Sequence, residues 1–319
     1  MILLCGIPSE TPLRMVTSRV EEVGAPYVML NQRRFAECEI WFELNHGEIT
    51  GELRIADDVY KLREFTAVYP RMMDDRFLPE LSDEPPDSPL RSYCRSFHDT
   101  LIRWMEITPA LVVNRCAPMA SNSSKPYQAQ LIREHGFLIP ETLITNDPEL
   151  VRDFRAKHGR IIYKSISAVR SIVQVLGDED DERLECIRWC PTQFQAFVDG
   201  TNLRVHTIGG EAFATAVRSE ATDYRYATSQ AGEPAALREV VLSDELKEQC
   251  LQLSKSLGLE FAGIDLKVTP DDEVYCFEVN PSPAFSYYEG NAGQPISAGV
   301  ARHLASGLAI CDRAVRSQN

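Results

Sequence analysis

Short apolar runs of strand length alternate with helix-like stretches in the first third of the chain. Three such runs are residues 2–6, 27–30 and 65–69. Between the first two, Thr11 as a cap and Pro12 as a first-turn proline predict the start of a helix whose apolar side chains recur at helical spacing. These side chains are Leu13, Val16, Val20 and Val23. The alternation predicts a small α/β domain over residues 1–112.

A hairpin and a long helix complete this domain. Residues 39–44 and 48–55 are strand-like and flank Asn45-His46-Gly47, which favours a hairpin turn. A helix is predicted from Ser88-Pro89 until Pro109, and its apolar stripe indicates core packing. The stripe consists of Leu90, Cys94, Phe97, Leu101 and Trp104. No GxGxxG motif follows the first strand, so no dinucleotide site is assigned here.

The middle of the chain predicts a second, mixed unit at residues 113–194. Residues 114–124 are small and polar, which favours a linker. Lys125-Pro126 then predicts a helix with Tyr127, Leu131 and Ile132 facing inward, and Asp147-Pro148 predicts the start of the next helix. Strand-like runs lie at residues 141–144, 160–164, 171–176 and 191–198.

A third unit is predicted at residues 195–319, with two hairpins and a helix. Gly209-Gly210 separates strand-like residues 202–208 and 211–219. A two-residue turn there pairs Arg204 with Thr215 and places Arg218 on the opposite face. A helix at residues 243–257 leads to the second hairpin, where two apolar runs flank Pro270-Asp271-Asp272-Glu273.

The second hairpin carries the acidic residues of most interest. The expected register pairs Thr269 with Val274 and so places Asp265 opposite Glu278. Asn280 lies two residues further on, on the same face. Facing carboxylates repel unless a positive group lies between them, and carboxylate and amide oxygens suit Mg²⁺ or Mn²⁺. The sequence therefore predicts a metal site, with solvated acids on an exposed hairpin as the alternative.

Composition and charge narrow the class of protein. The chain has 319 residues, 44% of them hydrophobic, and a net charge of −14, which argues against a nucleic-acid partner. No apolar run is long enough to cross a membrane, and residues 1–6 are too short for a signal peptide. The nine cysteines are scattered, with only Cys186 and Cys190 close together, which favours reduced thiols and a cytoplasmic location over a metal pair.

Two segments are candidates for binding a nucleotide. Lys164 ends an apolar strand and enters a loop with Ser165 and Ser167, a combination that can hold a polyphosphate. A solvated lysine is the alternative. The strand end at residues 195–198 offers backbone groups to an adenine edge, and Asp199 offers a carboxylate to ribose hydroxyls. An ordinary strand end is the alternative there.

Two arginines are candidates for contact with phosphate or carboxylate, because guanidinium groups bind both in a bidentate manner. Alternation places Arg204 and Arg218 on opposite faces, so both serve one site only if a bulge redirects one of them. Arg204 is favoured. His206 and His135 are predicted to be packing or surface residues, and residues 223–226 are consistent with either a substrate lid or a surface loop.

Taken in order, these pieces resemble the ATP-grasp superfamily of carboxylate–amine ligases. The resemblance covers about residues 115–305 and is most specific at the Asp…Glu-x-Asn ending. It is nearest to the RimK-like branch, which includes ribosomal-protein glutamate ligases and microviridin-type graspetide ligases. The N-terminal domain, with Val68-Tyr69-Pro70-Arg71 before its long helix, is also similar to the graspetide ligases.

The resemblance implies an ATP-grasp fold, α/β and α+β, in which two subdomains grip ATP beside an N-terminal α/β domain. It implies that Lys125 and Lys164 hold the phosphates, together with Ser165 and Ser167 of the following loop. That loop contains no glycine, unlike the glycine-rich loop of many relatives. The adenine would face the backbone of Gln195, Ala196, Phe197 and Val198, with Asp199 near the ribose.

The resemblance also implies a reaction. Asp265, Glu278 and Asn280 would hold two Mg²⁺ ions, while Arg204 and Arg218 stabilise charge. A substrate carboxylate attacks the γ-phosphate of ATP to give an acyl phosphate and ADP, and an amine or hydroxyl nucleophile then displaces phosphate. The partners expected are small-molecule or peptide carboxylates and amines, without nucleic acid or membrane, and a homo-oligomer is left open.

Three alternatives to this ligase stay open from the sequence. A macrocyclase would form ester or amide crosslinks in a ribosomal precursor peptide. A nucleotide-binding module would bind ATP without transfer, because binding requires fewer groups than catalysis. A kinase would release a phosphorylated small molecule and join no two substrates.

Overall fold

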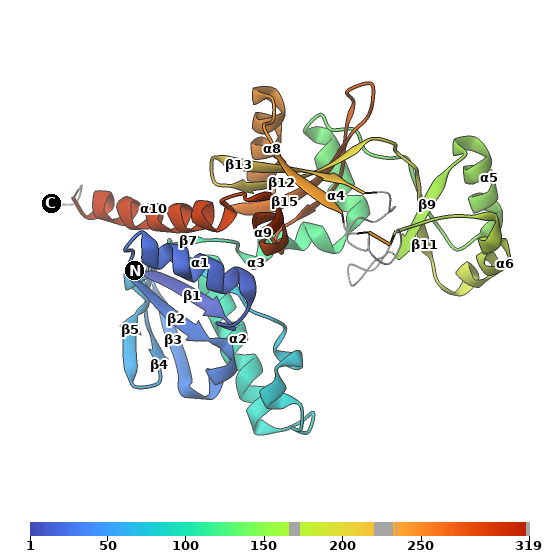
Figure 1. Ribbon diagram of the computed structural model, residues 1–319. Coiled ribbons are helices and arrows are strands. Elements are labelled where there is room, and N and C mark those ends of the chain that lie inside the picture. Colours follow the sequence, from blue (N-terminus) through green and yellow to red (C-terminus); the bar gives the residue numbers. More distant parts are fainter. Residues whose placement is uncertain (166–172, 220–231, 234, 317–319) are drawn as a thin grey trace.

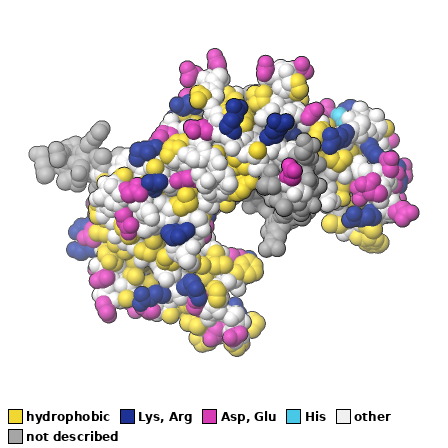
Figure 2. Space-filling view, in the orientation of Figure 1, with side chains coloured by type: hydrophobic (Ala, Val, Ile, Leu, Met, Phe, Trp, Pro, Cys, Tyr) yellow, Lys and Arg dark blue, Asp and Glu magenta, His cyan; other side chains and the backbone are white. Residues whose placement is uncertain are grey.

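The computed structural model describes residues 1–165, 173–219, 232–233 and 235–316, and Figure 1 shows their arrangement. Three main sheets follow one another along the chain, and a small three-stranded sheet packs beside the first. In this described part, the longest helices are not apolar enough to cross a membrane. Basic and acidic side chains are interspersed over the face shown in Figure 2.

The first sheet is parallel, and helices cover both of its faces. Its strands, in the order β2-β1-β6-β7, are β1 (Ile2–Gly6), β2 (Tyr27–Asn31), β6 (Ala67–Arg71) and β7 (Leu111–Val112). Because side chains alternate along β1, Leu3 and Cys5 pack in the core that includes α2 (Pro89–Ile107). Ile2 and Leu4 pack on the other face with α1 (Thr11–Glu22). Burial on both faces explains the uninterrupted apolar run.

Both helices predicted for this domain form, with differences at the ends of α1. Ser88 caps α2 by accepting a hydrogen bond from the Arg91 amide at 3.1 Å. Helix α1 starts after Glu10, so the prediction of Thr11 as its cap was wrong. Val23 was also wrongly placed in the buried stripe: it is 50% exposed, because α1 ends at Glu22.

The small sheet is an antiparallel meander. Its strands are β3 (Cys38–Asn45), β4 (Glu48–Ile55) and β5 (Asp58–Lys61), of which β5 was not predicted. Asn45 pairs with Glu48, so the turn consists of His46 and Gly47, both with positive φ. Such a turn matches the twist of a hairpin. Short 3-10 turns in this domain are η1 (Gln32–Glu37), η2 (Leu62–Glu64), η3 (Asp75–Phe77) and η4 (Pro79–Leu81).

A buried asparagine lies where the sequence favoured a polar linker. Asn114 is 5% exposed, and its Nδ2 donates to the carbonyl oxygens of Phe261 at 2.5 Å and Pro281 at 2.6 Å. Its Oδ1 accepts from the amides of Glu260 at 2.8 Å and Phe261 at 3.0 Å. The linker prediction was therefore wrong for Asn114, which ties this segment to both ends of the second hairpin. Two helical turns follow, α3 (Cys116–Met119) and η5 (Ala120–Ser123).

The central sheet is antiparallel in the order β10-β9-β11-β8. Its strands are β8 (Thr142–Thr145), β9 (Ile161–Ser165), β10 (Gln174–Val175) and β11 (Thr192–Ala196). One face packs against α5 (Pro148–His158), η6 (Asp178–Asp180), α6 (Asp181–Leu184) and η7 (Glu185–Trp189). Helix α4 (Lys125–Glu134) precedes this sheet and buries Ile132, but Tyr127 is 57% exposed, so its predicted inward position was wrong.

The C-terminal sheet has five antiparallel strands in the order β14-β13-β12-β15-β16. They are β12 (Thr201–Ile208), β13 (Glu211–Arg218), β14 (Ala236–Val240), β15 (Phe261–Val268) and β16 (Val274–Asn280). Helix α8 (Asp244–Ser256) packs against this sheet and is capped by Ser243. Two further helices, α9 (Ser286–Ala292) and α10 (Ile296–Arg316), were not predicted from the sequence.

Helix α10 connects the C-terminal sheet to the first one. Figure 1 shows it lying along the N-terminal sheet beside α1. Val300 and Leu304 of α10 share one apolar core with Leu4 of β1 and Phe261 of β15. A Cβ at Gly307 would lie 2.7 Å from the Thr66 carbonyl oxygen, so the glycine permits this close approach. The domain boundaries 1–112, 113–194 and 195–319 stay a prediction.

Replacing Asn114 is expected to destabilise the whole protein. Asn114→Ala leaves several buried backbone groups without partners, which predicts a loss of about 3 kcal/mol in the free energy of unfolding. Urea unfolding followed by circular dichroism measures it. Asn146→Ala is the matched control, because Asn146 is exposed and donates one hydrogen bond, to the Arg188 carbonyl oxygen. Equal stability of the two variants would contradict the role given to Asn114.

Candidate active site

The acidic hairpin has the predicted register at its functional end and a different one at its turn. Asp265 lies directly opposite Glu278, and Gly263 opposite Asn280. Beyond Asp265 the register shifts, and Val268 pairs with Val274, so the predicted pairing of Thr269 with Val274 was wrong. The shift leaves Phe277 as the extra residue of a bulge in β16, which increases the local twist.

Two basic residues lie against the facing carboxylates. Arg204 Nη1 is 2.7 Å from Asp265 Oδ1, and Lys125 Nζ is 4.0 Å from Glu278 Oε2. Their positive charges offset the repulsion between the two acids. The oxygens available to a metal are those of Asp265, Glu278 and the Asn280 amide, a set that suits Mg²⁺. No group of three or more His, Cys, Asp or Glu suited to a metal occurs in the described ranges. The Asn280 amide oxygen is therefore needed as the third ligand beside the two carboxylates.

The Arg204 side chain occupies a fitted position in β12. Arg204 is 5% exposed and pairs with Thr215, which confirms the predicted turn. Gly263 is next to the guanidinium: an added Cβ would lie 2.0 Å from Arg204 Nη2. The Tyr288 ring centre lies 5.6 Å from Arg204 Cζ. Only a residue without a side chain at position 263 leaves room for Arg204 in this orientation.

His206 supports Arg204 from the same strand. Arg204 Nε donates a long hydrogen bond of 3.5 Å to His206 Nε2, and the His206 ring packs against Tyr288 at 5.0 Å between centroids. Burial lowers the pKa of His206 well below its ordinary value, and the Arg204 charge lowers it further. The imidazole is therefore neutral and can accept from the arginine. The expectation that His206 is a packing residue holds, with this added contact to Arg204.

The second candidate arginine has a different environment. Arg218 ends β13, pairs with Ala236 and is exposed, whereas Arg204 is buried. Three positions separate Arg218 from Thr215, the partner of Arg204, so alternation directs the two arginines to opposite faces. Arg204 therefore contacts the acidic hairpin, whereas Arg218 lies on the opposite face of the sheet.

The central sheet presents polar side chains on the face opposite its helical cover. Lys164 is 8% exposed and lies opposite Gln193 in the pairing of β9 with β11. Gln195 lies on the same face of β11, because side chains alternate. The side chain of Ser165 and all of Ser167 are outside the described residues, as are residues 223–226.

A cleft of about 610 Å³ lies between α4, the central sheet and β16. Lys125, Gln195 and Phe277 are among its lining residues. The Thr142 hydroxyl donates to the Pro140 carbonyl oxygen at 2.9 Å, so its oxygen can only accept from Gln195 Nε2, also at 2.9 Å. This chain of hydrogen bonds fixes the amide orientation. Gln195 Oε1 then has no protein partner in the described part of the structure and is available as an acceptor.

The backbone predicted to face adenine makes several contacts with the protein. The amides of Ala196 and Phe197 donate to the carbonyl oxygens of Glu141 and Arg160 at 2.9 and 3.0 Å. Lys267 Nζ donates to the Val198 carbonyl oxygen at 2.9 Å. Asp199 is exposed, and its carboxylate accepts from the Gly200 amide at 2.9 Å.

Lys267 is a basic residue near this segment that the sequence reasoning missed. It lies two residues after Asp265 in β15, and its ammonium lies 5.2 Å from the centre of the Phe197 ring. Arg160 stacks on the same ring at 3.7 Å. Burial lowers the pKa of Lys267. The alternation along β15 contained the signal, because residues 265 and 267 share one face.

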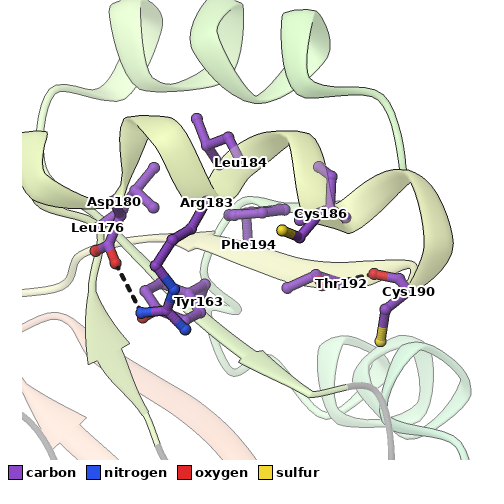
Figure 3. A pocket seen from close by; sticks show the side chains of 10 residues that line it. Tyr163, Leu176, Asp180, Arg183, Leu184, Cys186, Cys190, Thr192 and Phe194 are labelled. Atoms are coloured by element: carbon purple, nitrogen blue, oxygen red, sulfur yellow. Dashed lines mark hydrogen bonds and ion pairs between the residues drawn. The ribbon is translucent and has the colours of Figure 1, made fainter.

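A smaller cavity of about 200 Å³ lies on the other face of the central sheet (Figure 3). Tyr163 and Phe194 line it, and they alternate with Lys164 and Gln195 along their strands, so the cavity is separated from the cleft by the sheet. Cys186 and Cys190 also line it as free thiols, and Figure 3 shows that their sulfur atoms do not point toward each other.

Comparison with known proteins defines the class. Residues 122–304, more than half of the chain, match the family model described as the RimK-like ATP-grasp domain, and the chain belongs to this family. A probable alpha-L-glutamate ligase of Histophilus somni (strain 2336) is 21% identical over 324 residues, covering 95% of this chain and 97% of the relative.

Solved structures extend the similarity to the N-terminal domain. The ATP-grasp ligase PsnB, complexed with a phosphomimetic variant of its minimal precursor, Mg and ADP, has a TM-score of 0.76 at 26% identity, covering 96% of this chain and 98% of PsnB. Macrocyclase MdnC of Microcystis aeruginosa MRC, bound with precursor peptide MdnA, has a TM-score of 0.77 at 23% identity, covering 96% and 99%. The predicted ATP-grasp fold is confirmed. The chain is an enzyme of the ATP-grasp ligase class.

Gly263→Ala tests the position of Arg204. The added methyl group excludes the guanidinium from its site, and the displacement predicts a fall of about a hundredfold in kcat for ADP formation. The melting temperature of the variant shows whether the fold is retained. Gly210→Ala is the control, because a Cβ at Gly210 meets nothing within 4 Å. An unchanged kcat in Gly263→Ala would exclude a role for this arginine position in turnover.

Proposed function

We propose that this protein is an ATP- and Mg²⁺-dependent ligase that activates a carboxylate as an acyl phosphate and joins it to an amine on a peptide. One observation carries the proposal: Asp265 and Glu278 face each other on paired strands, with Arg204 and Lys125 against them. A hairpin that merely exposed its acids to solvent would not need a buried arginine fitted against Gly263.

The cleft beside this hairpin suits a nucleotide. Lys125 lines the cleft, and the buried Lys164 lies opposite Gln193, which also lines it; both lysines provide positive charge for phosphate oxygens. Gln195 Oε1 is an acceptor that suits the amino group of adenine, while a guanine would present its own carbonyl oxygen there. The backbone of residues 196–198 and Asp199 remain the proposed contacts of the base and ribose, and Ser165 and Ser167 of the phosphates.

Asp265, Glu278 and Asn280 are the proposed ligands of two Mg²⁺ ions, for which Mn²⁺ can substitute. Bound Mg²⁺ neutralises phosphate charge and orients the phosphoryl group. Arg204 is placed to stabilise the negative charge that develops on the transferring oxygens. Arg218 remains a second proposed cation, which requires a change in its orientation because it is exposed at the end of β13.

A peptide is the proposed substrate, because the similar enzymes PsnB and MdnC have structures with precursor peptides and match almost the whole of this chain. A macrocyclase that crosslinks side chains of a precursor peptide is the second candidate, supported by the same complexes. A module that binds a nucleotide without catalysis is less well supported, because it has no use for a buried Arg204 paired with the partly exposed Asp265.

Glu278→Gln tests the proposed metal site. The change removes one negative charge with little change in volume. It is expected to lower the rate of ADP formation about a hundredfold by weakening metal binding. Glu273→Gln in the turn of the same hairpin is the matched control, because Glu273 is exposed. Circular dichroism checks the fold. Full turnover by Glu278→Gln would remove Glu278 from the proposed site.

The reaction itself is tested by incubating the protein with Mg²⁺-ATP and a panel of amino acids, dipeptides and peptides. The expected result is ADP in equal amount to a product that has lost one water between two substrates or within one peptide, identified by mass spectrometry. A phosphorylated product would instead indicate a kinase. ATP binding without ADP formation across the panel would favour the nucleotide-binding module.

A further inference from the structure

A cavity of about 550 Å³ lies between the N-terminal sheet and the end of the acidic hairpin. Ile7 and Arg71 line it where the parallel strands β1 and β6 end, α2 contributes His98 and Asp99, and Ser282 lines it from the C-terminal sheet. The carboxyl end of a parallel sheet is a common location for ligands. The established class of the protein does not assign a ligand to this cavity.

Strand β16 connects this cavity to the nucleotide cleft. Phe277 lines the cleft, Glu278 and Asn280 follow, and Ser282 lines the cavity. The Ser282 amide donates to Asn280 Oδ1 at 2.9 Å, and Arg71 Nη1 donates to Ser282 Oγ at 3.1 Å. The proposed metal ligands therefore lie between the two spaces, as required if a nucleotide and a second substrate meet there.

Among the acids that line the cavity, one carboxylate has no ion pair within the described residues. Arg71 pairs with Glu10, and Arg95 pairs with Asp75 at 2.9 Å. The other two acids of the lining are Asp74, which is paired with Arg76 outside the cavity, and Asp99. Asp99 has no ion pair with any residue in the described ranges. Both cations of the lining are thus already neutralised, which favours a cationic ligand over an anionic one.

A buried polar atom also lacks a partner at this cavity. His98 is 4% exposed, and its Nδ1 lies 3.3 Å from Cys94 Sγ. Its Nε2 has no hydrogen-bond partner within the described residues. Burial lowers the pKa of His98, so the ring is neutral and carries one nitrogen donor and one acceptor. Buried polar groups are nearly always hydrogen-bonded, so an unpartnered one points to a ligand or water.

The rest of the lining is largely aliphatic. Met72, Ile102 and Met119 contribute apolar side chains, and methionine adapts its shape to an inserted chain. An aliphatic wall with one free carboxylate matches a flexible alkyl stem that ends in a positive charge. We propose that this cavity binds the lysine-like alkylammonium side chain of the amine substrate. The inference rests on the proposed ligase function, and it favours an amide product.

Three blocked amino acids test the inference by isothermal titration calorimetry, without ATP. Nα-acetyl-lysine amide carries the ammonium, Nα-acetyl-norleucine amide has the same stem without charge, and Nα-acetyl-glutamate amide carries a carboxylate. The lysine probe is expected to bind best. Asp99→Asn is expected to weaken its binding about tenfold and to leave the norleucine probe unchanged. Asp153→Asn on α5, an exposed acid remote from the cavity, is the control.

Each outcome decides for or against the cavity. Equal binding of the lysine and norleucine probes, or an unchanged affinity in Asp99→Asn, would overturn the inference. Preferred binding of the glutamate probe would also overturn it and assign the cavity to a carboxylate. Because no nucleotide is used, specific lysine binding with no ligation in any assay would reject the proposed ligase reaction while retaining the ammonium site. ADP-forming ligation without lysine binding would reject the ammonium site while retaining the proposed ligase reaction.

Discussion

The structure depends on two carboxylates that face each other on neighbouring strands. The repulsion between Asp265 and Glu278 is offset because Arg204 and Lys125 lie against them. Gly263 leaves room for the Arg204 guanidinium, and the neutral His206 ring accepts a hydrogen bond from it. A buried arginine is stable only when its charge is paired and its hydrogen bonds are satisfied. The pair thus links β12 to β15 and orients a cation toward the proposed reaction centre.

Hydrogen bonds from two other elements hold this hairpin in place. Asn114 binds the backbone at residues 260, 261 and 281. Gln128 of α4 exchanges two hydrogen bonds with the Val279 backbone, at 2.8 and 2.9 Å, and so fixes the helix that carries Lys125. Both side chains are buried, which makes their amides costly to remove. A rigid hairpin keeps the proposed site residues in fixed positions, which oriented transfer between bound substrates requires.

The position of β16 relates the two proposed substrates to each other. The cleft and the cavity open near opposite ends of the Phe277–Ser282 segment, with Glu278 and Asn280 between them. In the proposed reaction the substrate carboxylate must reach the γ-phosphorus of ATP, and the amine must then reach the carbon of the acyl phosphate. A short extended segment between the two spaces provides a suitable span. The N-terminal domain has a direct part in this arrangement, because its parallel sheet supplies one wall of the cavity and α10 joins it to the C-terminal sheet.

The sequence by itself determined most elements, the family and the facing of Asp265 with Glu278, because alternation, helix starts and turn residues are local signals. The tertiary structure alone decided the bulge at Phe277, the burial of Asn114, the exposure of Val23 and Tyr127, and the contacts of Lys267. Each of these depends on which distant segment packs against the residue. Whether a residue is hydrophobic or polar does not identify that partner, so the contacts of the wider site follow only from the way the sheets pack together.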